Sequence, residues 1–312
     1  MAWRGVRALS QLVRPVRIYE VGPRDGLQNE APVSTDIKVE LISRLAASGL
    51  TTIETTSFVS PKWVPQMSDA KEVYRYGFQL RDLHLPVIVP NRRGFDLAES
   101  VAMGVGHQVD EVAVLAACSP GFTKKNLNMT LDENLDRLSQ LVDYMRARNV
   151  RVRGYLSTAI ACPYDGWTAP ETCRTIAKLL LDMGCYEISL GDTIGVGTPR
   201  QIEAMIDAVS QSVPIDRLAI HAHDTYGQGV ANVVRAVEMG VRTVDSSVGG
   251  LGGCPYAKGA SGNVATEDVI YSLHGMGFET GISLSKLVET SRWICDKLGK
   301  PLSKVAAALS AP

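Results

Sequence analysis

The sequence lacks the features that mark membrane proteins and nucleic-acid-binding proteins. No apolar run is long enough to span a bilayer. The 32 basic and 33 acidic residues among 312 leave a formal net charge of -1, which gives no electrostatic reason to expect nucleic acid or a membrane surface as a partner. The six cysteines include no C-x-x-C pair, which indicates free thiols in a reducing compartment. The composition is typical of a globular protein with a large core.

Several catalytic signatures are also absent. The chain has neither a Walker loop nor a G-x-S-x-G elbow. The turn after the first expected strand reads Gly22-Pro-Arg-Asp-Gly26, which is not the G-x-G-x-x-G fingerprint of dinucleotide-binding folds. No lysine falls within any of the eight expected strands, which argues against an aldolase that forms a Schiff base. The chemistry must therefore come from other groups.

The N-terminus is rich in arginine and has no acidic residue before Glu20. This composition resembles a mitochondrial leader. A short disordered tail is the alternative, and we favour it because the first expected strand starts near Val16. We therefore expect a flexible extension over residues 1–15 in a cytoplasmic protein of bacterial type, with the mitochondrial matrix as the alternative location.

Eight short β-rich segments alternate with segments of helical periodicity. The expected strands are 16–21, 51–56, 85–89, 111–116, 150–157, 186–190, 218–222 and 243–248. This repeated alternation predicts a parallel sheet closed into a (β/α)8 TIM barrel. An open doubly wound sheet is the alternative, but it usually carries a nucleotide fingerprint after its first strand. Because no linker-like stretch interrupts the chain, we expect one catalytic domain over residues 16–312.

Three of the intervening segments show the helical period most clearly. They are residues 34–48, 131–148 and 199–213. In the first of them, Gly49 provides the expected stop. Helices are also expected from about residue 264 onward, beyond the eighth strand. These extra helices should pack against the barrel or against a partner subunit.

Polar residues recur at the carboxyl ends of the expected strands, where barrel enzymes place their active sites. They include Arg24, Asp25, Glu54, Asp192, His221, His223, Cys254 and Asn263. The i, i+2 spacing of His221 and His223 points both rings to the same face of a strand. With an oxygen donor such as Asp25, two imidazoles suit Mg²⁺, Mn²⁺, Zn²⁺ or Fe²⁺, and the carbonyl of Asn263 would favour Mg²⁺ or Mn²⁺. The alternative is that one histidine is only a hydrogen-bonded core residue.

Four further residues are candidates for the chemistry. Arg24 can stabilise a developing oxyanion through its fork of donors, although a structural ion pair with its neighbour is an alternative. Cys254 follows the glycine-rich stretch 249–253, so it can act as a proton donor or a nucleophile on a mobile loop. An incidental surface cysteine is the alternative there. Glu54 and Asp192 are acids on inner strand positions, expected to pair with Arg24, a ligand or the metal, unless they form a purely structural network with Arg24.

Several stretches resemble the hydroxymethylglutaryl-CoA lyase family. They are Glu20–Glu30, Ser57–Met67, Gly184–Pro199, His223–Gln228, Gly249–Ala257 and Gly259–Asn263. The similarity extends from about residue 16 to about residue 300, and the Gly-Pro-Arg-Asp-Gly turn and the cysteine loop are its most specific parts. The resemblance implies a (β/α)8 barrel that cleaves 3-hydroxy-3-methylglutaryl-CoA to acetoacetate and acetyl-CoA, a reaction of leucine catabolism and ketone body formation.

The resemblance also implies roles for individual residues. The metal ligands would be Asp25, His221, His223 and Asn263, with Mg²⁺ or Mn²⁺ as the cofactor. Arg24 would face the thioester carbonyl, and Cys254 would be the catalytic thiol. Glu54 and Asp192 would be supporting acids. The implied partners are an acyl-CoA thioester substrate and a second copy of the chain in a homodimer.

Some points stay open. The general base for the C3 hydroxyl would be His221 or Asp25. Pro120 follows Ser119 where the family usually has an acidic residue, and residues 157–162 lack the usual cysteine and glycine pattern. A related branched 3-hydroxyacyl-CoA is therefore an alternative substrate. A Claisen-type synthase on the same barrel is another alternative, but the cysteine loop favours the lyase. An inactive barrel that binds metal or a CoA thioester is a third, and the intact set of candidate site residues argues against it.

Overall fold

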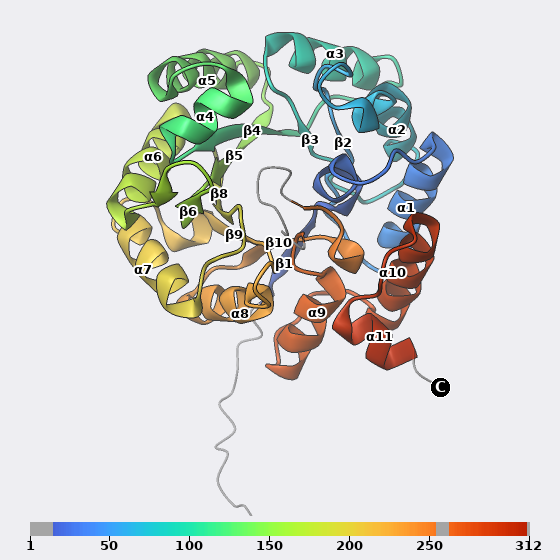
Figure 1. Ribbon diagram of the computed structural model, residues 1–312. Helices are drawn as coiled ribbons and strands as arrows, with labels where there is room; N and C mark the ends of the chain where they lie inside the picture. The colour runs from blue at the N-terminus through green and yellow to red at the C-terminus, as the bar shows by residue number, and fades with distance from the viewer. Residues whose placement is uncertain (1–14, 254–261, 311–312) are drawn as a thin grey trace, which may run out of the picture.

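The computed structural model describes residues 15–253 and 262–310. Within these residues, eight parallel strands form one curled sheet with helices around its outside (Figure 1). The strands are β1 (Arg17–Glu20), β2 (Thr56–Ser57), β3 (Val87–Ile88), β4 (Glu111–Ala117), β5 (Arg151–Ser157), β8 (Glu187–Asp192), β9 (Leu218–Ala222) and β10 (Thr243–Ser246). Their order, β1-β10-β9-β8-β5-β4-β3-β2, keeps strands that follow one another along the chain side by side.

The two ends of this sheet meet. The backbone N–H of Glu54 donates to the carbonyl oxygen of Glu20 at 2.8 Å, and the N–H of Glu20 donates to the carbonyl oxygen of Thr52 at 3.1 Å. These bonds join β1 to the segment that leads into β2, so the fold is (β/α)8-barrel-like. The expected second strand, 51–56, forms a regular ladder only at Thr56–Ser57, because its earlier residues make isolated bridges on both sides.

Helices follow the strands around the outside of the sheet (Figure 1). They are α1 (Thr35–Ala47), α2 (Ala70–Gly77), α3 (Arg92–Met103), α4 (Pro120–Leu127), α5 (Leu131–Arg146), α6 (Pro170–Met183), α7 (Pro199–Ser210) and α8 (Gly229–Met239). The three helices expected from periodicity are confirmed as α1, α5 and α7. Ser34 caps α1, and Gly49, with φ of +99°, follows its last turn. Thr130 and Glu133 form a capping box at the start of α5.

Three helices lie beyond β10, namely α9 (Thr266–Gly275), α10 (Leu284–Leu298) and α11 (Lys304–Ser310). They pack against the barrel: the N–H of Ser283 donates to the carbonyl oxygen of Ser48 at 2.7 Å, and the guanidinium of Arg44 lies 4.8 Å from the ring centre of Trp293. Among the described residues, no helix combines the length and the apolar character needed to cross a bilayer. The expected extension over residues 1–15 lies almost entirely outside the described part of the chain.

The interior of the barrel holds charges as well as apolar side chains. Arg153 of β5 is fully buried, and its Nε donates to Glu187 of β8 at 2.7 Å. Its Nη2 donates to Asp245 of β10 at 2.6 Å. Since a buried charge is stable only when it is paired and hydrogen-bonded, these three side chains form one structural unit that crosses the interior of the barrel.

Candidate metal centre and active site

A buried carboxyl group at the end of β1 fixes the turn that carries the first candidate ligand. This turn is η1 (Gly22–Gly26). Glu20 accepts hydrogen bonds from the N–H of Gly22 at 2.8 Å, the N–H of Val248 at 2.9 Å and the hydroxyl of Thr266 at 2.6 Å. Burial raises the pKa of Glu20 to about 7, although these hydrogen bonds act to lower it. One side chain therefore holds η1 to the segment after β10 and to α9.

The structure brings Asp25, His221 and His223 together. One oxygen or nitrogen atom from each of the three lies within 4.8 Å of the others. The Nε2 atoms of His221 and His223 are 3.3 Å apart, and Asp25 Oδ2 is 3.9 Å from His221 Nε2. Both histidines are buried, and Asp25 is partly exposed. The predicted pairing of the two rings on one face of the seventh strand is therefore present, with Asp25 opposite them.

Asn263 completes this cluster. It forms a β-bridge with His223, which lies just beyond the end of β9. Its Nδ2 donates to Asp25 Oδ2 at 2.7 Å and to the carbonyl oxygen of Leu251 at 3.1 Å. Its Oδ1 is buried and has no hydrogen-bond partner in the described chain. A carboxylate, two imidazoles and an unpaired amide oxygen at one place fit a divalent cation.

The protonation states suit a cation as well. Burial raises the pKa of Asp25, but the charge of Arg24 and the two histidines outweigh it and lower the pKa to about 2. Burial and, to a smaller extent, the neighbouring His221 together lower the pKa of His223 to about 4. At neutral pH the aspartate is therefore ionised and His223 is neutral, as metal ligands need to be.

Arg24 is held between two carboxylates. Its Nε donates to Glu54 Oε2 and its Nη1 to Asp25 Oδ1, each at 2.5 Å. The hydroxyl of Tyr155 donates to both oxygens of Glu54 at 3.3 Å, and the Arg24 guanidinium lies 5.4 Å from the Tyr155 ring centre. Arg24 thus makes the ion pair with its neighbour, and Glu54 has the pairing with Arg24 that its inner position predicts.

Asp192, at the end of β8, accepts its hydrogen bonds from backbone donors. It accepts hydrogen bonds from the N–H of Gly197 at 2.9 Å and from the N–H of Val196 at 3.2 Å. Burial raises the pKa of Asp192, while these backbone donors lower it. Asp192 therefore organises the loop that leads into α7, instead of pairing with Arg24.

Cys254 lies outside the described residues, but the segments on either side of 254–261 are close to the cluster. The Nδ2 of Asn29, which follows η1, donates to the carbonyl oxygen of Gly253 at 2.7 Å. A Cβ on Gly252, where φ is +111°, would lie 2.7 Å from Asn263 Nδ2. Glycine is therefore required where this segment passes the candidate ligands.

Two residues at the site were not identified from the sequence. Asp245 Oδ2 lies 3.3 Å from His221 Nδ1, and it also accepts a hydrogen bond from Ser189 at 2.7 Å. Tyr155 contacts Glu54, as described above. Asp245 and Tyr155 both lie in expected strands. A polar side chain within a buried strand is the sequence signal that could have identified them.

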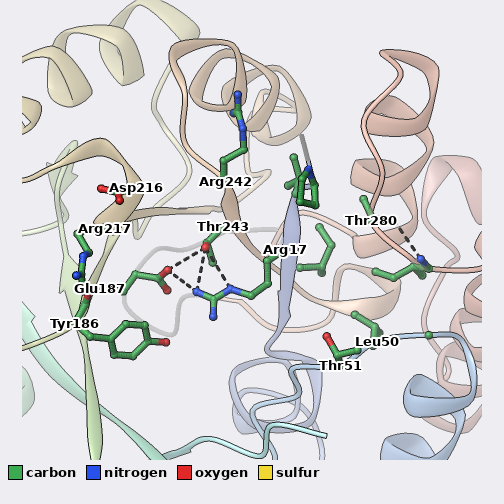
Figure 2. A pocket seen from close by; sticks show the side chains of 15 residues that line it. Arg17, Leu50, Thr51, Tyr186, Glu187, Asp216, Arg217, Arg242, Thr243 and Thr280 are labelled. Atoms are coloured by element: carbon green, nitrogen blue, oxygen red, sulfur yellow. Dashed lines mark hydrogen bonds and ion pairs between the residues drawn. The ribbon is translucent and has the colours of Figure 1, made fainter. Parts of the chain in front are cut away.

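A pocket at the opposite end of the barrel contains none of the candidate site residues. It is lined by the amino ends of the strands and by nearby loops, including Arg17, Tyr186, Glu187, Arg217 and Thr243 (Figure 2). Arg17 pairs there with Glu187 and with the hydroxyl of Thr243. This floor pocket is therefore separate from the candidate metal cluster at the carboxyl ends.

Known proteins resemble this chain in sequence over almost its whole length. Residues 15–294 match the model of the HMGL-like family. The chain is 52% identical over 303 residues to the mitochondrial hydroxymethylglutaryl-CoA lyase of Pongo abelii, covering 96% of this chain and 91% of the relative.

Solved structures agree in both fold and sequence. Hydroxymethylglutaryl-CoA lyase from Pseudomonas aeruginosa matches with a TM-score of 0.89 and 47% identity, covering 96% of this chain and 98% of that one. An HMG-CoA lyase from Acinetobacter baumannii, in complex with coenzyme A and 3-methylmalate, matches with a TM-score of 0.87 and 32% identity, covering 94% and 95%. Both proteins are carbon–carbon lyases by name. The chain described here belongs to the HMGL-like family.

Proposed function

We propose that this protein cleaves 3-hydroxy-3-methylglutaryl-CoA to acetoacetate and acetyl-CoA with the help of a divalent metal. The observation that carries the proposal is the convergence of Asp25, His221 and His223 beside Arg24 in a chain about half identical to named lyases of this substrate. The relative solved with coenzyme A supports an acyl-CoA thioester as the substrate class.

Asp25, His221, His223 and the unpaired oxygen of Asn263 would hold the metal. The mixture of carboxylate, imidazole and amide oxygen supports Mg²⁺ or Mn²⁺. When bound, such a cation polarises a substrate oxygen and lowers the pKa of a hydroxyl group. Arg24, already bound to Asp25, keeps that carboxylate ionised and therefore ready for a cation.

The protein's own groups would then carry the proton transfers. A base at the cluster, Asp25 or His221, removes the proton from the C3 hydroxyl. As the C2–C3 bond breaks, its electron pair passes to the enolate of acetyl-CoA. The contacts of Arg24 in the described chain use Nε and Nη1, so Nη2 is left to donate to the enolate oxygen. Cys254 would return a proton to C2.

A coupled assay for acetyl-CoA tests the function directly. Purified protein is mixed with 3-hydroxy-3-methylglutaryl-CoA, first with a chelator and then with excess Mg²⁺ or Mn²⁺. We expect release that stops with the chelator and returns with the metal. Asp25→Asn should abolish the release of acetyl-CoA. Asp110 is an exposed aspartate outside the cluster, so Asp110→Asn should leave the release unchanged. No release under any condition would rule out the named substrate.

The two loops that depart from the family pattern lie in contact with each other. Ser119, before the unusual Pro120, caps α4, and its hydroxyl lies 2.5 Å from Asp165 Oδ2 and 2.9 Å from Cys162 Sγ. These contacts tie together the two loops that depart from the family pattern. A related branched 3-hydroxyacyl-CoA is therefore the second candidate substrate. Competition between it and 3-hydroxy-3-methylglutaryl-CoA, measured as the ratio of kcat/KM values, distinguishes the two.

We also propose a homodimer in the cytoplasm. Two apolar side chains on the C-terminal helices, Tyr271 and Leu309, are more than half exposed, which supports a second copy as a partner. Sedimentation equilibrium gives the oligomeric state. Since one relative is named mitochondrial, the matrix is the alternative location, and a fluorescent protein fused behind residues 1–17 in cultured cells separates the two.

A further inference from the structure

A line of alternating charges runs through the barrel from the floor pocket to a candidate metal ligand. Arg17 pairs with Glu187 at the floor (Figure 2). Glu187 pairs with Arg153 at 2.7 Å, and Arg153 with Asp245 at 2.6 Å. Asp245 then lies 3.3 Å from Nδ1 of His221. Arg153 and Asp245 are both buried, so water does not compete for these contacts.

We propose that Asp245 and Arg153 are positioning residues that fix His221 in the tautomer able to bind a metal; this rests on the proposed metal-dependent function. Arg153 donates to both oxygens of Asp245, at 3.1 and 2.6 Å, and Ser189 donates to one of them at 2.7 Å. A carboxylate held ionised by these donors can only accept from His221. The proton of His221 therefore sits on Nδ1, and Nε2 is left bare toward the metal cluster.

No carboxylate in the described chain fixes the tautomer of the second histidine, His223. The Nδ1 of His223 is buried and has no hydrogen-bond partner among residues 15–253 and 262–310. Its Nε2 lies 3.3 Å from the bare Nε2 of His221, and this contact is a hydrogen bond only when His223 is the donor. The two histidines therefore hold opposite tautomers in the metal-free protein. His223 must move its proton to Nδ1 before it can bind a cation, whereas His221 need not.

Nitrogen NMR of the metal-free wild-type protein tests the assignment without any substitution. Imidazole nitrogens with and without a proton have well-separated chemical shifts, and His221→Asn and His223→Asn assign the signals. We expect a protonated Nδ1 on His221 and a protonated Nε2 on His223. A protonated Nε2 on His221 would overturn the proposal.

Metal affinity provides the second test, with a matched control. Asp245→Asn removes the carboxylate that accepts from His221, and we expect Mn²⁺ to bind about 10–100-fold more weakly by titration calorimetry without substrate. Asp110 also contacts a histidine Nδ1 and an arginine, His84 and Arg151, both at 2.9 Å, but on the surface. Asp110→Asn should therefore leave Mn²⁺ affinity unchanged within about twofold.

Arg153→Lys separates charge from geometry. The ammonium keeps the positive charge but cannot bind both oxygens of Asp245 and reach Glu187 at once. We expect a loss of Mn²⁺ affinity smaller than that of Asp245→Asn. Unchanged affinity in both variants would overturn the proposal. Because no substrate is used, these outcomes do not depend on whether the wild-type protein releases acetyl-CoA.

Discussion

Replacing Arg24 by glutamine should separate two tasks of one guanidinium group, catalysis and charge compensation. Arg24 binds Glu54 and Asp25, both at 2.5 Å, and the Glu54 side chain has no exposed surface. Removing one partner of a buried ion pair typically costs about 3–5 kcal/mol, because the other charge stays buried. Losing one donor to a developing oxyanion typically costs about 10²–10³-fold in turnover. Arg24→Gln should therefore lower both the free energy of unfolding and acetyl-CoA release.

A second substitution distinguishes the two effects. Glutamine at position 54 removes the charge left behind, so Arg24→Gln/Glu54→Gln should recover most of the stability and none of the activity. Burial already raises the pKa of Glu54 against the opposing charge of Arg24, and loss of Arg24 raises it further. A group with a raised pKa in the folded state favours folding at low pH and loses this contribution as the pH rises. The instability of the single variant should therefore shrink in acid.

Urea unfolding followed by tryptophan fluorescence, together with the coupled assay, measures both quantities on the same preparations. Metal binding in the single variant, measured by calorimetry, shows whether the cluster is still assembled. Wild-type turnover in Arg24→Gln would refute the catalytic role. A double variant as unstable as the single one would refute the role in charge compensation.

Three further predictions concern the metal cluster and its supporting turn. Asn263→Ala removes the unpaired amide oxygen, and calorimetry should show Mn²⁺ binding about tenfold more weakly, or about 1.4 kcal/mol. Burial and the nearby His221 lower the pKa of His223 to about 4 in the folded protein. In the unfolded chain the same imidazole takes up a proton near pH 6.5. Urea unfolding of the metal-free protein should therefore show this residue's contribution to stability falling by up to about 3 kcal/mol across that window, and His223→Asn should lack this part of the slope. Gly26→Ala would bring a Cβ to 2.7 Å from the hydroxyl oxygen of Ser247, so we expect a loss of about 1–3 kcal/mol in thermal or urea unfolding, whereas Gly275→Ala meets nothing within 4 Å and should be tolerated. Unchanged Mn²⁺ affinity, parallel pH profiles, or equal stability of the two glycine variants would each contradict the respective prediction.

The fold could be predicted from the sequence because its signals are local. Each expected strand is a short β-rich segment, and helices such as α1 carry their own caps, Ser34 and Gly49. The i, i+2 spacing of His221 and His223 is likewise a property of one strand, so their shared face needed no knowledge of the rest of the chain. The short hairpin of β6 (Ala161–Cys162) and β7 (Gly166–Trp167) was missed because two-residue strands carry no period.

The pairing of the charged residues could not be predicted, because it depends on how the sheet closes. Arg153 and Asp245 are 92 positions apart and meet only inside the barrel. Asp192 was expected to pair with Arg24, a ligand or the metal, and in the described chain its carboxylate accepts from backbone donors four and five residues further along. A buried acid can be satisfied by a distant arginine or by its own loop, and the residue type alone does not distinguish these outcomes.

The three donors to Glu20 also set the order in which the protein can mature. Gly22 is its neighbour, but Val248 and Thr266 are synthesised more than 200 residues later. Asp25 is likewise synthesised long before its neighbours in the cluster, His221 and Asn263. The Glu20 carboxyl group therefore has only one of its three donors through most of translation, and the four proposed metal ligands are not all present until Asn263 has left the ribosome. Chains that terminate earlier lack the Val248 and Thr266 donors to the buried Glu20 carboxyl group. We expect such chains to be degraded as misfolded products instead of persisting as weakly active enzymes.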